Sequence, residues 1–190
     1  TDDSIELLAD VDGQSIPPGQ WQLNGRGDQQ QLQLEGLVGR LLDGELKVTG
    51  DVAWAPQVDW NMQVGATTIR PGELLAVDPD AVFNLQLATS GRLEDTGPVA
   101  EVELQEVGGT LIGQPLSGGG RLSYSSDGIT IDELALRSAD MALSADGSLG
   151  EQSDLGWQLQ LPSLGQLLPE AQGQINGEGR VTGPMTAPRV

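Results

Sequence analysis

Paired carboxylates are the residues of this sequence whose spacing comes closest to catalytic chemistry. They stand two residues apart at three places: Asp10 and Asp12, Asp78 and Asp80, and Glu101 and Glu103. Two carboxylates that face one cleft can hydrolyse a glycosidic bond. The first two pairs, however, lie in turn-like sequence, where aspartate accepts hydrogen bonds from backbone amides, and the third lies on polar positions of a strand. The pattern favours carboxylates that cap turns or face solvent. An acidic glycan-active enzyme is therefore the least favoured function for this sequence.

Other short motifs also favour structure over chemistry. The 190-residue chain has no histidine and no cysteine, which removes the commonest general base and the usual metal ligands. The segment "DVDG" at 10–13 lacks the distal glutamate of a calcium loop. "LSGGG" at 116–120 has no phosphate-binding loop to accompany it, and "RGD" at 26–28 is typical of a turn. We therefore expect no enzyme activity, no metal and no cofactor.

Composition limits the partners. With 28 acidic and 9 basic residues the formal net charge is −19, which repels nucleic acid and anionic membrane surfaces. Only 3% of residues are aromatic and 27 are glycine, as in a turn-rich chain with a thin core. No apolar run approaches the ~20 residues of a membrane helix. Because the chain begins at Thr1 and ends in "GPMTAPRV", we expect one segment, 1–190, of a longer protein that carries any anchor elsewhere.

The elements that must position these residues are strands, because apolar and polar residues alternate almost throughout. "GDVAWAPQVDWNMQV" at 50–64 is the longest example. Alternation with period two indicates a strand with one apolar face. The same pattern occurs at these sets: Trp21 and Leu23; Leu32 and Leu34; Leu46 and Val48; Phe83, Leu85 and Leu87; Val102 and Leu104; Leu122 and Tyr124; Ile129 and Ile131; Leu134 and Leu136; Met141 and Leu143.

About a dozen strands joined by short turns predict an antiparallel meander whose polar face meets water. Two leucine-rich segments that begin with proline, 71–80 and 162–171, interrupt the alternation and predict one or two short helical turns.

A long internal repeat is also predicted. Seven positions between Leu46 and Val64 match seven positions between Leu143 and Leu161 with a constant offset of 97, including Trp60 and Trp157. After the leucine-rich segments, Gly91 matches Gly179. The repeat units cover approximately 41–93 and 138–181. Strands with one apolar face cannot bury that face alone, which favours an elongated, open-ended β architecture.

The residues then resemble a known family. "LVGRLLDGELKVTGDVAWAP", the strand "WNMQV" and the tail "LGWQLQLPSLGQLLPEAQGQINGEGRVTGPMTAP" resemble the TamB family of the AsmA-like, bridge-like lipid transfer superfamily. The resemblance covers most of the chain and contains no catalytic signature. It implies an all-β fold: an elongated, curved antiparallel sheet folded into a groove with an apolar concave face.

The resemblance also implies a function. Such a protein resides in the periplasm of a Gram-negative bacterium as part of an inner-membrane-anchored protein. The family is associated with phospholipid transport between the inner and outer membranes and with outer-membrane protein assembly, including autotransporter secretion. The implied partners are phospholipid acyl chains or unfolded outer-membrane protein strands, and the outer-membrane β-barrel TamA.

The predicted lining of the groove consists of apolar residues that share the alternating phase: Trp54, Trp60, Met62, Val64, Phe83, Leu85, Leu87, Val102, Leu104, Leu134, Leu136, Trp157, Leu159 and Leu161. The alternative is a structural β-solenoid or β-sandwich domain of a cell-surface protein, in which the same residues form a closed core. Alternation is identical in both cases, so the sequence leaves open whether the apolar face is an open groove or a filled interior.

Overall fold

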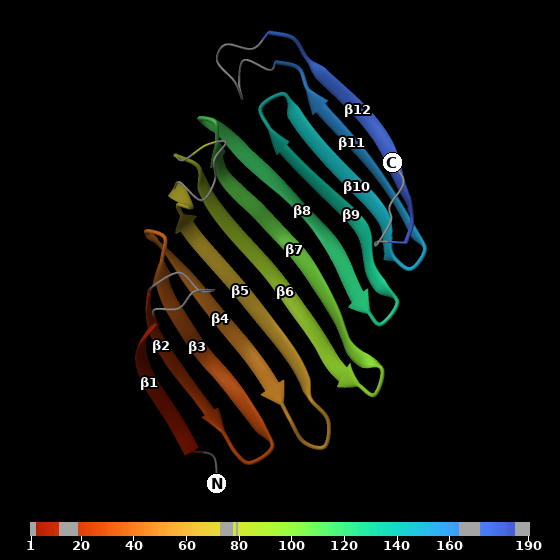
Figure 1. The fold of residues 1–190 in the computed structure, drawn as a ribbon. Coiled ribbons are helices and arrows are strands. Elements are labelled where there is room, and N and C mark those ends of the chain that lie inside the picture. The colour runs from red at the N-terminus through yellow and green to blue at the C-terminus, as the bar shows by residue number, and fades with distance from the viewer. Residues whose placement is uncertain (1–2, 12–18, 73–77, 79, 164–171, 185–190) are drawn as a thin grey trace.

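The computed structural model describes residues 3–11, 19–72, 78, 80–163 and 172–184. Its twelve strands form one antiparallel sheet in the order of the sequence (Figure 1). The strands are β1 Asp3–Val11, β2 Gly19–Gly27, β3 Gln31–Leu41, β4 Gly44–Ala53, β5 Asp59–Ile69, β6 Val82–Glu94, β7 Gly97–Leu111, β8 Gln114–Ser125, β9 Gly128–Ser138, β10 Met141–Gly150, β11 Ser153–Leu161 and β12 Ile175–Gly183. The predicted all-β, curved antiparallel sheet is confirmed. The predicted helical turns at 71–80 and 162–171 fall largely outside the described residues.

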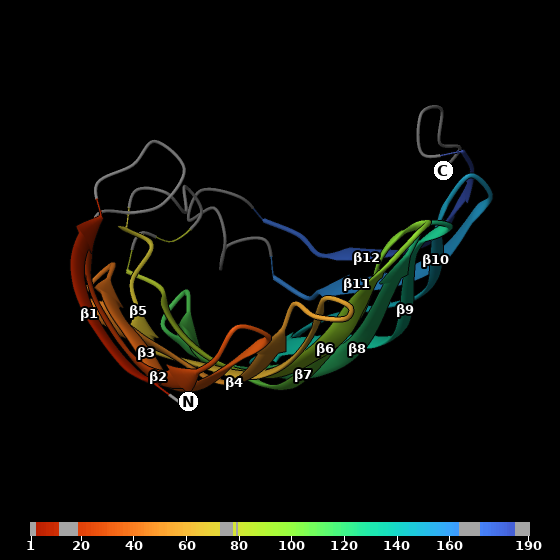
Figure 2. The ribbon, with the colours of Figure 1, turned by 90° about the horizontal axis from the view of Figure 1, so that it is seen from below.

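The sheet is a single layer. Figure 2 shows it bowed into a trough, with the two edges that carry the hairpin turns raised on the same side. The axis of the trough runs across the strands, from β1 to β12. Each of these two outermost strands has one neighbour, so within the described residues the sheet is open at both ends.

Four strands carry an extra residue that interrupts the pairing. Each bulge sets two residues opposite a single partner residue of an adjacent strand, in β3, β5, β7 and β9. We call these pairs the bulge doublets: Glu35–Gly36, Thr67–Thr68, Gln105–Glu106 and Asp132–Glu133. In each strand the doublet lies between apolar residues three positions apart, as Leu104 and Val107 are in β7. A doublet therefore occupies one place on the polar face, and the alternation resumes with the apolar side chains on their original face.

The bulges explain the direction of the curvature. A bulge bends its strand and increases the local twist. Because the extra residue lengthens only the polar face, that face becomes the longer, convex one and the apolar face becomes concave. Three of the doublets lie near the middle of β3, β7 and β9, where a bend raises both ends of a strand. We refer to the apolar face as the inner face and to the polar face as the outer face.

Large aromatic rings on the inner face lie over glycines of the next strand. Trp60 is paired in register with Gly91, and a Cβ at Gly91 would lie only 2.3 Å from the Trp60 ring. Trp157 is paired with Gly179, where the corresponding distance is 2.7 Å. Trp21 and Gly39 make a third such pair, at 2.6 Å. An aromatic ring that covers a cross-strand glycine buries one side without a second layer.

Hydrogen bonds between neighbouring turns connect the hairpins along the edges of the trough. Trp54 donates from its backbone N to the carbonyl of Gln30 and from Nε1 to the carbonyl of Gln29, both at 2.8 Å. On the opposite edge, the backbone N of Arg70 donates to the carbonyl of Leu42 at 2.8 Å. These bonds hold successive hairpins together where the strand ladders end.

The aromatic–glycine pairs predict a sharp contrast between glycines. Gly91→Ala places a methyl group against the Trp60 ring and 2.5 Å from the carbonyl oxygen of Val99. We expect this variant to lose about 1–3 kcal/mol of stability, the usual cost of overpacking. Gly65→Ala is the control, because a Cβ at Gly65 meets no atom within 4 Å. Urea unfolding midpoints measure both variants, and equal midpoints would show that the ring does not rest on the glycine.

Candidate functional site: the apolar inner face

Cross-strand pairing joins the inner-face residues into continuous rows that run along the trough. One row, here called the central row, crosses eleven strands from β2 to β12 and contains only apolar residues and glycine. Its members, in order, are Leu23, Leu37, Val48, Val64, Leu87, Leu104, Gly120, Leu134, Ala145, Trp157 and Gly179.

A second row runs beside it from Trp21 in β2 to Gly177 in β12. It too is apolar throughout: Trp21, Gly39, Leu46, Ala66, Leu85, Val107, Gly118, Leu136, Leu143, Leu159 and Gly177. On the other side of the central row, Met62 and Val102 flank Thr89, which is paired with both. The inner face is therefore an unbroken apolar strip at least two side chains wide.

The side chains of this strip are only partly covered. Every large residue of the central row has intermediate exposure, and Leu143 of the second row is 36% exposed. The buried apolar residues of the described chain are few and scattered: Leu34, Ala66, Ala81, Leu116 and Leu161. No large side chain in the described part is fully buried. This distribution is that of a sheet face with one open side.

The structure brings most of the predicted lining residues onto this face. Val64, Leu87, Leu104, Leu134 and Trp157 lie in the central row. Leu85, Leu136 and Leu159 lie in the second row. Trp60 is paired with Gly91, and its Nε1 donates to Oγ1 of Thr89 at 3.3 Å, so its indole N–H is already satisfied within the sheet. Phe83 lies opposite Ile69 near the beginning of β6.

Two of the predicted lining residues have different surroundings. Trp54 follows β4 at the edge of the trough, where it is 45% exposed and bonded to the β2–β3 turn. Leu161, at the end of β11, is only 3% exposed and is covered by its neighbours.

Several row members are absent from the lining that the sequence predicts. Leu23, Leu37, Val48, Val107 and Leu143 share the same face as the predicted residues. Period two identifies Leu23, Val48 and Leu143 as apolar strand positions. Leu37 and Val107 follow bulge doublets and stand out of phase with Leu34 and Leu104. Only the register shows that all five continue the same rows. The glycines of the rows, such as Gly118 and Gly120, carry no hydrophobic signal at all.

The outer face is polar and carries the ion pairs. Arg26 pairs with Glu35 at 2.9 Å and Arg121 with Glu103 at 3.5 Å, both exposed. The guanidinium of Arg180 makes a two-pronged contact with the Asp154 carboxylate, with Nη2 to Oδ2 at 2.6 Å.

The Arg180 hydrogen bonds lower the pKa of Asp154 below its ordinary value. The small stabilisation from this exposed pair is thus present above the ordinary pKa of the carboxyl and is lost as pH falls through the lowered one. The charges of this face keep it in contact with water.

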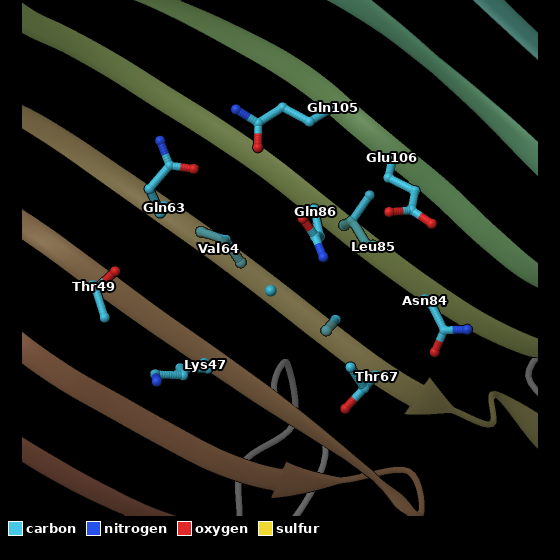
Figure 3. Close-up of a pocket in the computed structure, with 12 residues that line it drawn as sticks. Lys47, Thr49, Gln63, Val64, Thr67, Asn84, Leu85, Gln86, Gln105 and Glu106 are labelled. Carbon is cyan, nitrogen blue, oxygen red and sulfur yellow. The ribbon is translucent and has the colours of Figure 1, made fainter.

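A shallow hollow of about 460 Å³ lies on the outer face over β4 to β7 (Figure 3). It surrounds Gly65, and Lys47, Gln63, Gln86 and Glu106 are among its lining side chains. Its polar lining mixes opposite charges, amides and the hydroxyls of Thr49 and Thr67. Among the described residues no cluster of three or more acidic side chains could hold a metal ion.

The part of the chain that the structure describes contains no helix with the length and apolar character that a membrane crossing requires.

Comparison with known proteins identifies the family. The domain described as "TamB, N-terminal domain" matches residues 1–190. A protein from Haemophilus influenzae named "Translocation and assembly module subunit TamB" is 26% identical over 187 residues, which are 97% of this chain and 14% of that protein. The chain thus spans about a seventh of the length of this relative. No solved structure matches. With a family match over its whole length and a single curved sheet of alternating strands, the chain belongs to the TamB family.

Proposed function

We propose that the inner face shields hydrophobic cargo from water, and that the acyl chains of phospholipids are its main cargo. The observation that supports this most strongly is the central row, an unbroken line of apolar residues and glycines that crosses eleven strands. A closed core would be apolar too, but an opposite layer would cover its side chains, whereas every large residue of the central row is partly exposed. A cargo that moves along the trough does need it, because any polar break would raise the free energy of the cargo at that point.

The energies are compatible with reversible binding. A fully buried methylene gains roughly 0.8 kcal/mol, and a half-exposed face gives only part of that gain. An acyl chain lying over several strands is therefore held without being trapped. The glycines of the rows make room for neighbouring side chains: the rings of Trp21 and Trp157 lie over Gly39 and Gly179.

We further propose a place for this segment in the cell. The name of the Haemophilus relative supports a role in a translocation and assembly module. We place the chain in the periplasm of a Gram-negative bacterium, within an inner-membrane-anchored protein that acts with the outer-membrane barrel TamA. In this role it is non-enzymatic, carries phospholipid between the two membranes and supports the assembly of outer-membrane proteins.

One observation favours a second cargo. Among the described residues, β1 and β12 each have one neighbouring strand, and a strand edge without a partner can pair with an extended polypeptide. An unfolded outer-membrane protein strand would then bind through its backbone at a sheet edge. The inner-face rows play no part in that mode, so the two cargoes contact different residues.

Site-specific photo-crosslinking separates these modes in cells. A benzophenone side chain at Leu87, on the inner face, is expected to capture phospholipid several-fold more efficiently than one at the adjacent Gln86, on the outer face. Leu159 and Gln158 provide a second matched pair in β11. Equal lipid capture at inner and outer positions, or capture of polypeptide alone at Leu87, would contradict an acyl-chain trough.

Leu87→Arg tests whether the inner face must be apolar for function. Because Leu87 is half-exposed, its guanidinium can reach water, and we expect a loss of only about 1–2 kcal/mol in stability. Transport should nevertheless fail, since the charge interrupts the central row. Gln86→Arg is the control and should retain both stability and transport. Complete unfolding of Leu87→Arg in circular dichroism would instead indicate a closed core that buries an unpaired charge.

A further inference from the structure

The bulge doublets share features that regular pairing does not require. All four lie in odd-numbered strands, which run in the same direction, and the described even-numbered strands between them carry none. All their residues except Gly36 are exposed. The β5 doublet is held by a side-chain hydrogen bond, in which the backbone N of Thr68 donates to Oδ1 of Asn84 at 2.8 Å.

The doublets of β3 and β9 lie on one line across the outer face. Thr49 stands opposite the β3 doublet, and five successive pairings lead from it to Glu133 of the β9 doublet. The residues on this line are Thr49, Gln63, Ala88, Glu103, Arg121 and Glu133. The β7 doublet lies only two to three residues along its strand from Glu103. We call this line, from Thr49 to Glu133, the crease of the outer face. The central row runs close to it on the inner face.

We propose that the bulge doublets set the width of the trough, and with it the space that the inner face offers to a cargo. Each doublet adds length to the outer face of its strand and none to the inner face. The unbulged strands between them must follow the bend, because they are hydrogen-bonded on both sides. The identity of the cargo rests on the proposed function, whereas the control of width does not.

The doublets permit an unusually clean test, because removing one residue restores regular alternation. Without Gln105, the sequence Leu104, Glu106, Val107 alternates inner, outer, inner. Without Asp132, the same holds for Ile131, Glu133 and Leu134. Every apolar side chain therefore keeps its face, and we expect both deletion variants to fold. Loss of folding in both would overturn the proposal, since it would show that the doublets serve strand pairing and not width.

The measurement is made on β8, which lies between the two shortened strands and keeps its own length. Spin labels are placed at Gln114→Cys, the first residue of β8, and at Ser126→Cys, the residue that follows the strand. Both positions are exposed, and the chain has no other cysteine. Twelve residue steps span roughly 40 Å when fully extended. In the variant lacking Gln105 and Asp132, we expect the distance between the two spin labels to increase toward this fully extended length. The expected increase is about one residue rise, roughly 3 Å.

The control is Gln105→Ala with Asp132→Ala, which changes the side chains and keeps the bulges. Its distance distribution should equal that of the parent chain. An unchanged distance in the folded double deletion would overturn the proposal. A longer distance in a chain whose inner face captures no lipid would leave the width control standing and remove only the proposed cargo.

Discussion

A single-layer sheet has no opposing layer against which to bury its apolar face, and the rest of this structure follows from that constraint. Burial has to come from neighbours within the same sheet. The rings of Trp21, Trp60 and Trp157 obtain it by covering glycines of the next strand, and curvature brings the remaining inner side chains closer together. The result is a face that is stable in water but still half-open, which is the property a transient hydrophobic cargo requires.

Curvature and function are connected through the same residues. The outer-face doublets bend the strands, and the bend makes the apolar face concave. Charged pairs such as Arg121 and Glu103 lie on the crease and keep the convex side hydrated. The inner rows then run parallel to the crease across the sheet. Strand pairing thus produces a trough with an apolar floor and a polar outside, and no helix among the described residues covers either face.

Much of this fold can be predicted from the sequence, because period two specifies strands and one apolar face without knowledge of register. The bulges are harder to predict. Ile129 and Ile131 stand out of phase with Leu134 and Leu136, and alternation alone treats the two pairs as separate features, whereas the structure joins them in β9 through a doublet. The pairing of Trp60 with Gly91 depends on register across a long connection. The glycines of the central row are invisible to any hydrophobic pattern, so the continuity of the candidate site could not be predicted.

The central claim is that the inner face is open to its surroundings. Paramagnetic relaxation by a small soluble nitroxide, measured on the methyl groups of the isolated chain, tests it directly. Leu161, at 3% exposure, provides an internal reference for a protected side chain. We expect the methyl signals of Leu87, Leu104 and Leu134 to broaden far more than those of Leu161. Equal protection of all four leucines would show that the apolar face is covered and not open.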